Sequence, residues 1–320
     1  MCGFILVGSV QKIGLVLSGG GGKGAYEVGV WRAMEQLGLA KDIAAVSGTS
    51  VGALNAALFA QGDLTKAENA WLSMKPSDVL SIDLKGIVAA LIKGGIVVSP
   101  AIMSVVKTLA MSGVFSRDGL HRIIKEYLDE ATVKQRGVPC YVCATKLPLF
   151  KATYFSLQEY RQETIEDILL ASSAIPIIFP KQVVQGDLYL DGFIRDNTPI
   201  KPLVEEGCNI IIAVMLSRSD LLPIDKYPDC KIIPIYPQEH PGGALSFTQS
   251  AEKMQRGYDD AMAVLAPVFE LVEINYQYSV ELLKYKKQHM DFESSVQDIE
   301  SEKQRLENAK IDLLKEMSKW

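Results

Sequence analysis

Short apolar runs alternate with amphipathic segments along most of the chain. Apolar residues cluster over strand length at 13–17, 43–46, 139–144, 154–157, 188–190, 209–215 and 231–236. Other segments repeat apolar residues at the spacing of a helical face, at 26–37, 53–60, 63–80, 118–128 and 165–172. Strands that alternate with helices predict a mostly parallel, doubly wound sheet with right-handed crossovers. We therefore expect an α/β fold over residues 13–236.

From Ala261 onward the pattern is that of a long helix. Apolar residues stand every seven positions, at Tyr278, Tyr285, Phe292, Ile299, Leu306 and Leu313. The positions four residues further on are apolar at Leu282, Val296 and Met317, but His289, Lys303 and Lys310 interrupt this second row. This degraded heptad predicts a helical, coiled-coil-like tail over residues 266–320. Two interpretations stay open: a helix packed on the domain, or a surface for self-association or a partner.

Composition narrows the function class. The net charge of −5 and the lack of a Lys/Arg-rich run argue against nucleic-acid binding. Cys140 and Cys143 form a C-x-x-C within an apolar strand pattern, which favours structural cysteines over a redox or zinc pair. No run of 18 apolar residues and no basic stretch before the apolar start occur. We therefore expect a cytoplasmic protein.

A serine at a predicted strand-to-helix turn is the candidate nucleophile. Ser50 lies in Gly48-Thr49-Ser50-Val51-Gly52, between the run 43–46 and the small-residue helix 53–60. Glycines two positions before and after the serine relieve the crowding of such a turn. The helix start directs N–H groups and a positive dipole end toward the serine. A bare GxSxG motif is common by chance, so other residues have to complete the chemistry.

A glycine block follows the first predicted strand and could bind an oxyanion. Successive N–H groups of Gly19, Gly20, Gly21, Gly22, Lys23 and Gly24 can form an anion-binding nest at a helix start. The same block matches a dinucleotide fingerprint, with Asp42 near the spacing for a ribose contact. Asp42 precedes its strand instead of ending it, however, and that strand ends in the serine turn. The combination favours acyl chemistry.

Either a histidine or a carboxylate could be the base that activates the serine. The chain has three histidines, of which His121 lies in a predicted amphipathic helix and His289 in the tail. His240 lies in a loop after a strand, where catalytic groups often stand, and remains a candidate base. Asp191 ends a short strand before Gly192, so its carboxylate can reach the crevice of Ser50. A buried carboxylate with a raised pKa can accept a hydroxyl proton. We favour Asp191.

Taken together, four blocks resemble the patatin-like phospholipase family. They are Ser18-Gly19-Gly20-Gly21-Gly22-Lys23-Gly24-Ala25, Gly48-Thr49-Ser50-Val51-Gly52, Ala171-Ser172-Ser173-Ala174-Ile175-Pro176 with Phe179-Pro180, and Asp191-Gly192 with Asn197 and Pro199. The resemblance covers residues 13–265, after an N-terminal segment 1–12. It implies a three-layer α/β/α sandwich with a Ser-Asp dyad that needs neither histidine, metal nor cofactor.

By this match Ser50 is the nucleophile, Asp191 the base, and the glycine block 19–24 the oxyanion hole. Gly48 and Gly52 shape the turn, while Gly192, Asn197 and Pro199 support the site. Phe193 stands where the family usually has Gly or Ala, a change that could narrow the pocket. The helical tail has no counterpart in the minimal family domain.

Residues 86–112 are the most apolar segment, with Lys93 and Lys107 as their only charges. Gly94, Gly95 and Pro100 prevent one membrane-spanning helix. The segment is either buried helix or an apolar flap over the active site that contacts a membrane surface.

The sequence therefore predicts a serine lipid acyl hydrolase acting on phospholipid or lysophospholipid esters. A general carboxylesterase or neutral-lipid lipase is the alternative within enzymes. A scaffold protein that works through its helical tail is the alternative outside them. A nicotinamide-dependent oxidoreductase is a more remote hypothesis.

Overall fold

The structure is a computed structural model that describes residues 11–74, 81–82, 115–116, 118–176, 179–239, 243 and 246–317. The apolar segment 86–112 and His240 lie outside these residues. The strands are β1 (Ile13–Leu17), β2 (Ile43–Thr49), β3 (Ser81–Ile82), β4 (Phe115–Ser116), β5 (Cys140–Lys146), β6 (Lys151–Ser156), β7 (Gln182–Val184), β8 (Asp187–Asp191), β9 (Ile210–Val214) and β10 (Lys231–Ile235).

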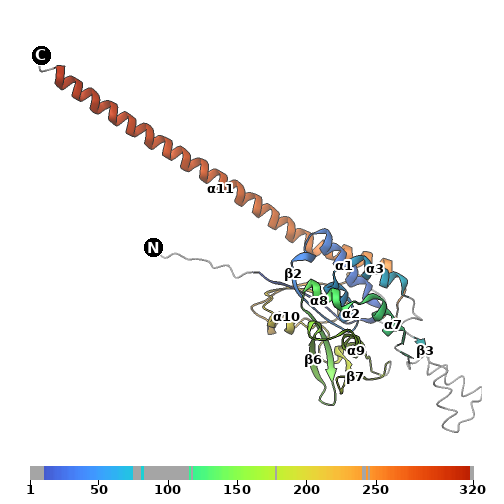
Figure 1. The fold of residues 1–320 in the computed structure, drawn as a ribbon. Coiled ribbons are helices and arrows are strands. Elements are labelled where there is room, and N and C mark those ends of the chain that lie inside the picture. The colour runs from blue at the N-terminus through green and yellow to red at the C-terminus, as the bar shows by residue number, and fades with distance from the viewer. Residues whose placement is uncertain are drawn as a thin grey trace, which may run out of the picture. The chain divides into compact units, whose positions relative to one another are not determined.

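The helices are α1 (Ala25–Gln36), α2 (Val51–Gln61), α3 (Leu64–Ser73), α7 (Asp118–Tyr127), α8 (Glu130–Arg136), α9 (Gln162–Ser172), α10 (Lys201–Glu205) and α11 (Ser250–Met317). Short 3-10 turns lie at Gly21–Lys23, Ala40–Asp42, Leu157–Glu159, Gly192–Ile194 and Ile224–Lys226. One group of helices in contact with one another consists of α1, α2, α3, α7 and α8 (Figure 1). Helix α10 lies apart from this group and packs against β1 and β2.

Eight strands of the described residues form one mixed sheet. Its order is β10-β9-β1-β2-β5-β8-β7, and β6 pairs with β5. The strands from β10 to β5 are parallel, as the alternation of strands and helices predicts. Strands β6 and β8 pair antiparallel with β5, and β7 pairs antiparallel with β8. Gln185 and Gly186 join β7 to β8 and both have positive φ, the conformation of a tight hairpin turn.

Strands β2 and β8 both pair with the same edge of β5, one after the other. Strand β6 occupies the other edge, because it pairs with residues 141–146. Strand β2 pairs up to Thr49 opposite Cys143, and β8 pairs from Asp191 opposite Ala144. Since β2 and β8 run in opposite directions, their carboxyl ends face each other next to consecutive residues of β5. This topology brings residues 49–50 close to Asp191.

Side chains of the parallel strands alternate between two covered faces. Val16 and Ala213 lie in a buried cluster with Leu203 of α10. Leu15 instead packs on the opposite side, in a cavity wall that includes Phe59 of α2. The predicted fold class is confirmed: a mixed α/β sheet carries helices on both faces, and a helical region follows it.

The chain divides into two compact units, residues 1–264 and 265–320. Helix α11 begins in the first unit and supplies most of the second. Within the described residues, no helix is both long and apolar enough to cross a membrane.

Candidate active site

Ser50 sits at a sharp turn between β2 and α2. Its backbone has φ 56° and ψ −124°, a region that non-glycine residues rarely adopt. Gly48 and Gly52 make this turn feasible. A Cβ at Gly48 would overlap the carbonyl of Gly52, and one at Gly52 would overlap the carbonyl of Leu17. The strained backbone presents the serine hydroxyl at the start of α2.

Ser50 and Asp191 are joined by a direct hydrogen bond. Ser50 Oγ donates to Asp191 Oδ2 over 2.8 Å, although the two residues are 141 positions apart. The other carboxylate oxygen accepts the backbone N–H of Phe193 at 2.9 Å. Thr145 Oγ1 donates to the carbonyl of Asp191 at 2.9 Å and so fixes the end of β8 to β5.

Burial makes Asp191 a stronger base than an exposed carboxylate. The residue is 0% exposed, and Ser50 is 5% exposed. Loss of solvent raises the pKa of Asp191 from 3.8 to about 7, although the hydrogen bonds from Phe193 and Ser50 lower it in part. Near neutral pH the carboxyl group can therefore both accept and return a proton.

Ser172, at the end of α9, holds the backbone of the serine turn. Its Oγ accepts the N–H of Ser50 at 2.8 Å and donates to the carbonyl of Cys143 at 2.6 Å. Both bonds are buried. The N–H of Ser50 is therefore occupied, so a negative charge that develops next to Ser50 has to be stabilised by other donors.

The glycine block lies beside the serine turn. Gly19 approaches the Cβ of Ser50 so closely that a Cβ of its own would lie 3.2 Å away. Backbone hydrogen bonds engage the N–H groups of Gly19, Lys23 and Gly24, and Lys23 Nζ donates to the carbonyl of Leu216 at 3.2 Å. Among the described residues, no backbone acceptor takes the N–H groups of Gly20, Gly21 or Gly22.

All three predicted supporting residues contact the elements that carry the site. The backbone carbonyl of Asn197 accepts the N–H of Gly19 at 3.2 Å, and the side-chain Nδ2 of Asn197 donates to the carbonyl of Gly19 at 3.2 Å. The carbonyl of Pro199 accepts the hydroxyl of Ser47 at 2.7 Å. Gly192 fits against the carbonyl of Cys143, where a Cβ would overlap.

A pocket opens at Ser50. Its wall contains Gly21 of the glycine block and Ser173, together with apolar side chains. The remaining residues are Val51, Leu54, Trp71, Met74, Leu120, Ile175, Phe179 and Phe247. Ser173 is 5% exposed, and its Oγ has no hydrogen-bond partner in the part of the chain that the structure describes. Phe193 is half exposed and is not among the residues that line this pocket.

The two described histidines lie in other interactions. His121 Nε2 is 2.8 Å from Glu166 Oε2, and His289 Nδ1 is 3.3 Å from Glu293 Oε1. Within the described ranges, no group of three or more His, Cys, Asp or Glu residues is arranged to hold a metal ion.

Sequence reasoning missed several residues of the pocket wall and its supports. Trp71, Phe247 and Lys253 read as ordinary helix or loop positions, and only the fold brings them to the glycine block. Ser172 and Ser173 belong to one of the four blocks that resemble the family, but their residue type alone predicts no role for them.

The chain is similar to known proteins over more than half of its length. The model of the family described as "Patatin-like phospholipase" matches residues 15–204. An uncharacterized NTE family protein of Mycobacterium tuberculosis is 24% identical over 215 residues, which are 67% of this chain and 52% of that protein. Lysophospholipase NTE1 of Cryptococcus neoformans is 26% identical over 210 residues, 66% of this chain and 11% of that protein. The chain thus spans about half the length of the first relative and far less of the second.

Two solved structures are similar at low identity. VipD from Legionella pneumophila gives a TM-score of 0.46 at 17% identity, covering 81% of this chain and 67% of that one. Human GIVD cytosolic phospholipase A2 gives 0.45 at 12% identity, covering 83% and 59%. The family model matches more than half of the chain and spans both Ser50 and Asp191, as the sequence blocks predicted. This chain belongs to the patatin-like phospholipase family.

Proposed function

We propose that this chain is a serine lipid acyl hydrolase with a Ser50–Asp191 dyad. The 2.8 Å hydrogen bond between Ser50 Oγ and Asp191 Oδ2 in a buried site carries the proposal. Ser50 Oγ attacks the carbonyl carbon of an ester, while its proton passes to Asp191. The tetrahedral intermediate then expels the alcohol, which takes the proton, and an acyl-serine remains.

The glycine block would stabilise the charge on the carbonyl oxygen. Within the described residues, backbone hydrogen bonds leave the N–H groups of Gly20, Gly21 and Gly22 available as donors, and Gly21 lines the pocket of Ser50. Such fixed donors typically contribute a factor of about 10² to 10³ in kcat each. Asp191 then takes a proton from water, which attacks the acyl-serine. As the bond between the acyl carbon and Ser50 Oγ breaks and the fatty acid leaves, Asp191 returns this proton to Ser50 Oγ.

Phospholipid and lysophospholipid esters are the proposed substrates. The family's description and the name of the Cryptococcus relative, a lysophospholipase, support this class. The apolar wall of the pocket suits a fatty acyl group. A cytoplasmic location and peripheral membrane contact through 86–112 stay predictions. A general carboxylesterase or neutral-lipid lipase is the alternative.

The test compares wild type with Ser50→Ala and Asp191→Asn. Fatty-acid release would be measured from phosphatidylcholine vesicles, from lysophosphatidylcholine and from a soluble short-chain ester, with circular dichroism as the control for folding. We expect both variants to lose at least about 10³-fold in kcat on every substrate, because nucleophile and base act as a unit. An active Asp191→Asn protein would contradict the dyad and direct attention to His240. Preference for the soluble ester would favour the esterase alternative.

A scaffold role through the tail is the second candidate, and one observation favours it. The apolar heptad residues of α11 are exposed although they form one stripe: Tyr278, Tyr285, Phe292, Ile299 and Leu306 each expose more than 60% of their surface within the chain. An exposed stripe of this spacing is typical of a helix that pairs with another helix. Self-association is compatible with hydrolysis, so this role could exist beside the proposed activity.

A further inference from the structure

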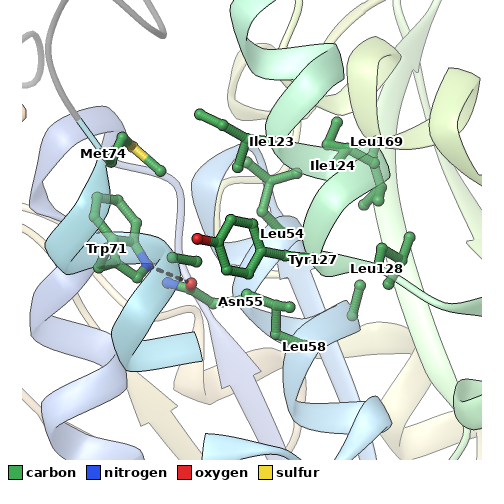
Figure 2. A pocket seen from close by; sticks show the side chains of 12 residues that line it. Leu54, Asn55, Leu58, Trp71, Met74, Ile123, Ile124, Tyr127, Leu128 and Leu169 are labelled. Atoms are coloured by element: carbon green, nitrogen blue, oxygen red, sulfur yellow. Dashed lines mark hydrogen bonds between the residues drawn. The ribbon is translucent and has the colours of Figure 1, made fainter. Parts of the chain in front are cut away.

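A second apolar cavity adjoins the pocket of Ser50. It lies between α2, α3, α7 and α9, and its space, including the part open to solvent, is about 430 Å³. Its wall consists of Leu54, Asn55, Ala57, Leu58, Ala70, Trp71, Met74, Ile123, Ile124, Tyr127, Leu128 and Leu169. Figure 2 shows Trp71 and Met74 on one side of this space and Ile123 and Ile124 on the other.

The cavity borders the pocket of Ser50. Leu54, Trp71 and Met74 belong to the walls of both spaces. Leu54 lies one helical turn after Ser50, because α2 begins at Val51. A ligand that starts at Ser50 and passes these three side chains therefore enters the second cavity.

The chemistry of the wall selects an apolar ligand. The polar atoms present already have partners: Trp71 Nε1 donates to Asn55 Oδ1 at 2.9 Å, drawn as a dashed line in Figure 2. The hydroxyl of Tyr127 is 3.0 Å from that of Ser73. A polar or charged ligand group would lose its hydration there without gaining hydrogen bonds. An unbranched hydrocarbon chain needs none.

We propose that this cavity receives the distal part of the acyl chain whose ester carbonyl lies at Ser50. The proposal rests on the proposed hydrolase function and names its specificity pocket. Ala57 and Ala70 are the small side chains of the wall, and both are buried. They leave the space that a long chain would occupy.

Chain-length profiles test the proposal. The residue Ala57 lines the second cavity and is absent from the wall of the Ser50 pocket. Ala57→Leu should leave kcat/KM for a 4-nitrophenyl butyrate ester within about twofold and lower it at least tenfold for the dodecanoate ester. Ile123→Ala enlarges the same cavity and should shift the preference toward longer chains. Ile233→Ala, another half-buried isoleucine on β10, is the matched control and should shift nothing.

A binding measurement separates this proposal from the proposed function. In a Trp31→Phe, Trp320→Phe background, Trp71 is the only tryptophan. A fatty acid brominated at its methyl end should quench Trp71 fluorescence, and Ala57→Leu should weaken this quenching at least tenfold. If the fatty acid quenches Trp71 but no ester is hydrolysed, the cavity binds an acyl chain and the proposed hydrolase function is wrong. If wild type hydrolyses esters, but Ala57→Leu changes neither the chain-length profile nor the quenching, the proposal that this cavity receives the acyl chain is wrong.

A different observation carries a second inference, which concerns Lys253. This residue lies in the first turn of α11 and beyond the family match of residues 15–204. It is only 4% exposed, and its Nζ donates to the carbonyl of Gly22 at 2.8 Å and to that of Ser246 at 2.6 Å. A buried ammonium group thus holds the carbonyl of a residue in the glycine block.

The surrounding contacts leave this part of the loop little freedom. A Cβ at Gly22 would overlap the backbone of Ser246, so the segment before α11 packs directly on the glycine block. The next residue, Phe247, lines the pocket of Ser50 and stacks on Trp71 with ring centroids 6.4 Å apart. The peptide that carries the carbonyl of Gly22 also contains the N–H of Lys23, which donates to the carbonyl of Gly20. Fixing this peptide therefore holds the turn from Gly20 to Lys23 in one shape, and with it the N–H groups of Gly21 and Gly22 inside the turn.

We infer that Lys253 is a positioning residue that orients the N–H donors of the glycine block. It acts through the loop and does not touch the reacting atoms. The inference also rests on the proposed hydrolase function. An oxyanion site works because its donors are held in place before the reaction, and a charge-assisted hydrogen bond holds the carbonyl of Gly22 firmly.

The test uses Lys253→Met, which keeps the apolar stem and removes the ammonium group, and Lys253→Gln, which keeps a neutral donor. We expect Lys253→Met to lower kcat at least tenfold with KM within about twofold. The Ki of a trifluoromethyl ketone, whose serine adduct carries an oxyanion, should rise by the same factor. Lys253→Gln should fall between it and wild type, and Lys66→Met should resemble wild type.

Two outcomes would overturn the inference. If wild type hydrolyses esters and both Lys253 variants keep its kcat and Ki, the lysine does not position the loop. If KM rises as much as kcat falls, the substitution has damaged the pocket as a whole. A wild type that hydrolyses no ester removes the hydrolase itself, and the glycine block then has no oxyanion to bind.

Discussion

Asn55 connects the carboxyl group of Glu27 to the backbone of the glycine block. Its Nδ2 donates to Glu27 Oε2 at 2.7 Å and to the carbonyl of Gly24 at 2.9 Å, while its Oδ1 accepts the indole N–H of Trp71. Burial raises the pKa of Glu27 well above its usual range. Burial therefore favours the uncharged form of this carboxyl group in the network.

Removing Asn55 should affect both stability and turnover. Asn55→Ala would leave the indole N–H of Trp71 without its partner and would remove one hydrogen bond from the carboxyl of Glu27. The carbonyl of Gly24 would lose one of its two bonds, since it also accepts the N–H of Glu27. Each unsatisfied buried group costs about 1–3 kcal/mol, so we expect at least about 2 kcal/mol of lost stability in urea unfolding. We expect kcat to fall as well, because Gly24 ends the glycine block.

Trp71→Phe is the control for this network, since it removes one hydrogen bond and keeps an aromatic ring. It should lose no more than about half as much stability. Equal stabilities of wild type and Asn55→Ala would show that the network does not hold the loop.

Ser172 and Ser173 are adjacent serines for which we predict opposite effects. Ser172→Ala removes two buried hydrogen bonds, to the N–H of Ser50 and to the carbonyl of Cys143. It should cost about 2 kcal/mol of stability or more. Ser173→Ala removes a buried hydroxyl without a partner in the described structure, so stability should stay equal or rise.

The hydroxyl of Ser173 should matter only when substrate is present, because it lines the pocket of Ser50. We therefore expect Ser173→Ala to lower kcat/KM about tenfold while the melting temperature does not fall. Thermal melts and ester kinetics on the two variants check this pair. A destabilised Ser173→Ala protein with normal kinetics would contradict the prediction.

The raised pKa of Asp191 predicts the acidic limb of the activity profile. Asp191 accepts a proton only when ionised, and its pKa is about 7. The kcat/KM value should therefore rise with pH and reach half its maximum near pH 7. A profile flat between pH 5 and 8 would exclude Asp191 as the base in the free enzyme.

The same shift predicts how stability depends on pH. The folded pKa lies above the unfolded value of 3.8, so the folded protein holds this proton more tightly. The stabilisation is complete below about pH 4 and is lost as pH rises through about 7, by roughly 4 kcal/mol in total. Urea unfolding of Asp191→Asn at pH 5 and pH 8 should show a smaller difference than wild type, since asparagine does not titrate.

The sequence predicted the parallel half of the sheet and the Ser50 turn well, because both depend on local signals. Strand β1 has the predicted bounds 13–17, and β2 extends only three residues beyond its predicted end. The antiparallel strand β7 was missed, since three residues with one buried side chain give no periodicity. The direct contact of Ser50 with Asp191 depends on β2 and β8 sharing one edge of β5, which no local pattern encodes.

The supporting groups were out of reach of sequence reasoning for the same cause. Lys253 bonds to a residue 231 positions away, and a lysine in an amphipathic helix normally indicates a solvated face. Asp196 is partly buried and accepts the hydroxyl of Tyr154 at 2.7 Å, a contact between residues 42 positions apart that no local pattern indicates. Long-range partners of polar residues become visible only in the folded chain.

The heptad stripe of α11 leads to a prediction about assembly. Phe292 and Ile299 expose 67% and 69% of their surface, and pairing with a second helix would remove them from water. We expect the full chain to sediment as a dimer at micromolar concentration, as coiled-coil seams usually drive association of two strands. Phe292→Glu with Ile299→Glu should weaken the dimer at least about 100-fold, because like charges would then face each other across the seam.

The matched control places the same charges outside the stripe, in Gln297→Glu with Ser301→Glu, and should leave the dimer intact. Sedimentation velocity over a concentration series measures the state of all three proteins, and circular dichroism checks that α11 stays helical. Since the heptad is interrupted by His289, Lys303 and Lys310, the association should be weaker than that of an uninterrupted zipper. A wild type that remains monomeric at 100 micromolar would exclude the stripe as a homodimer seam, and would leave a helix of another protein as its partner.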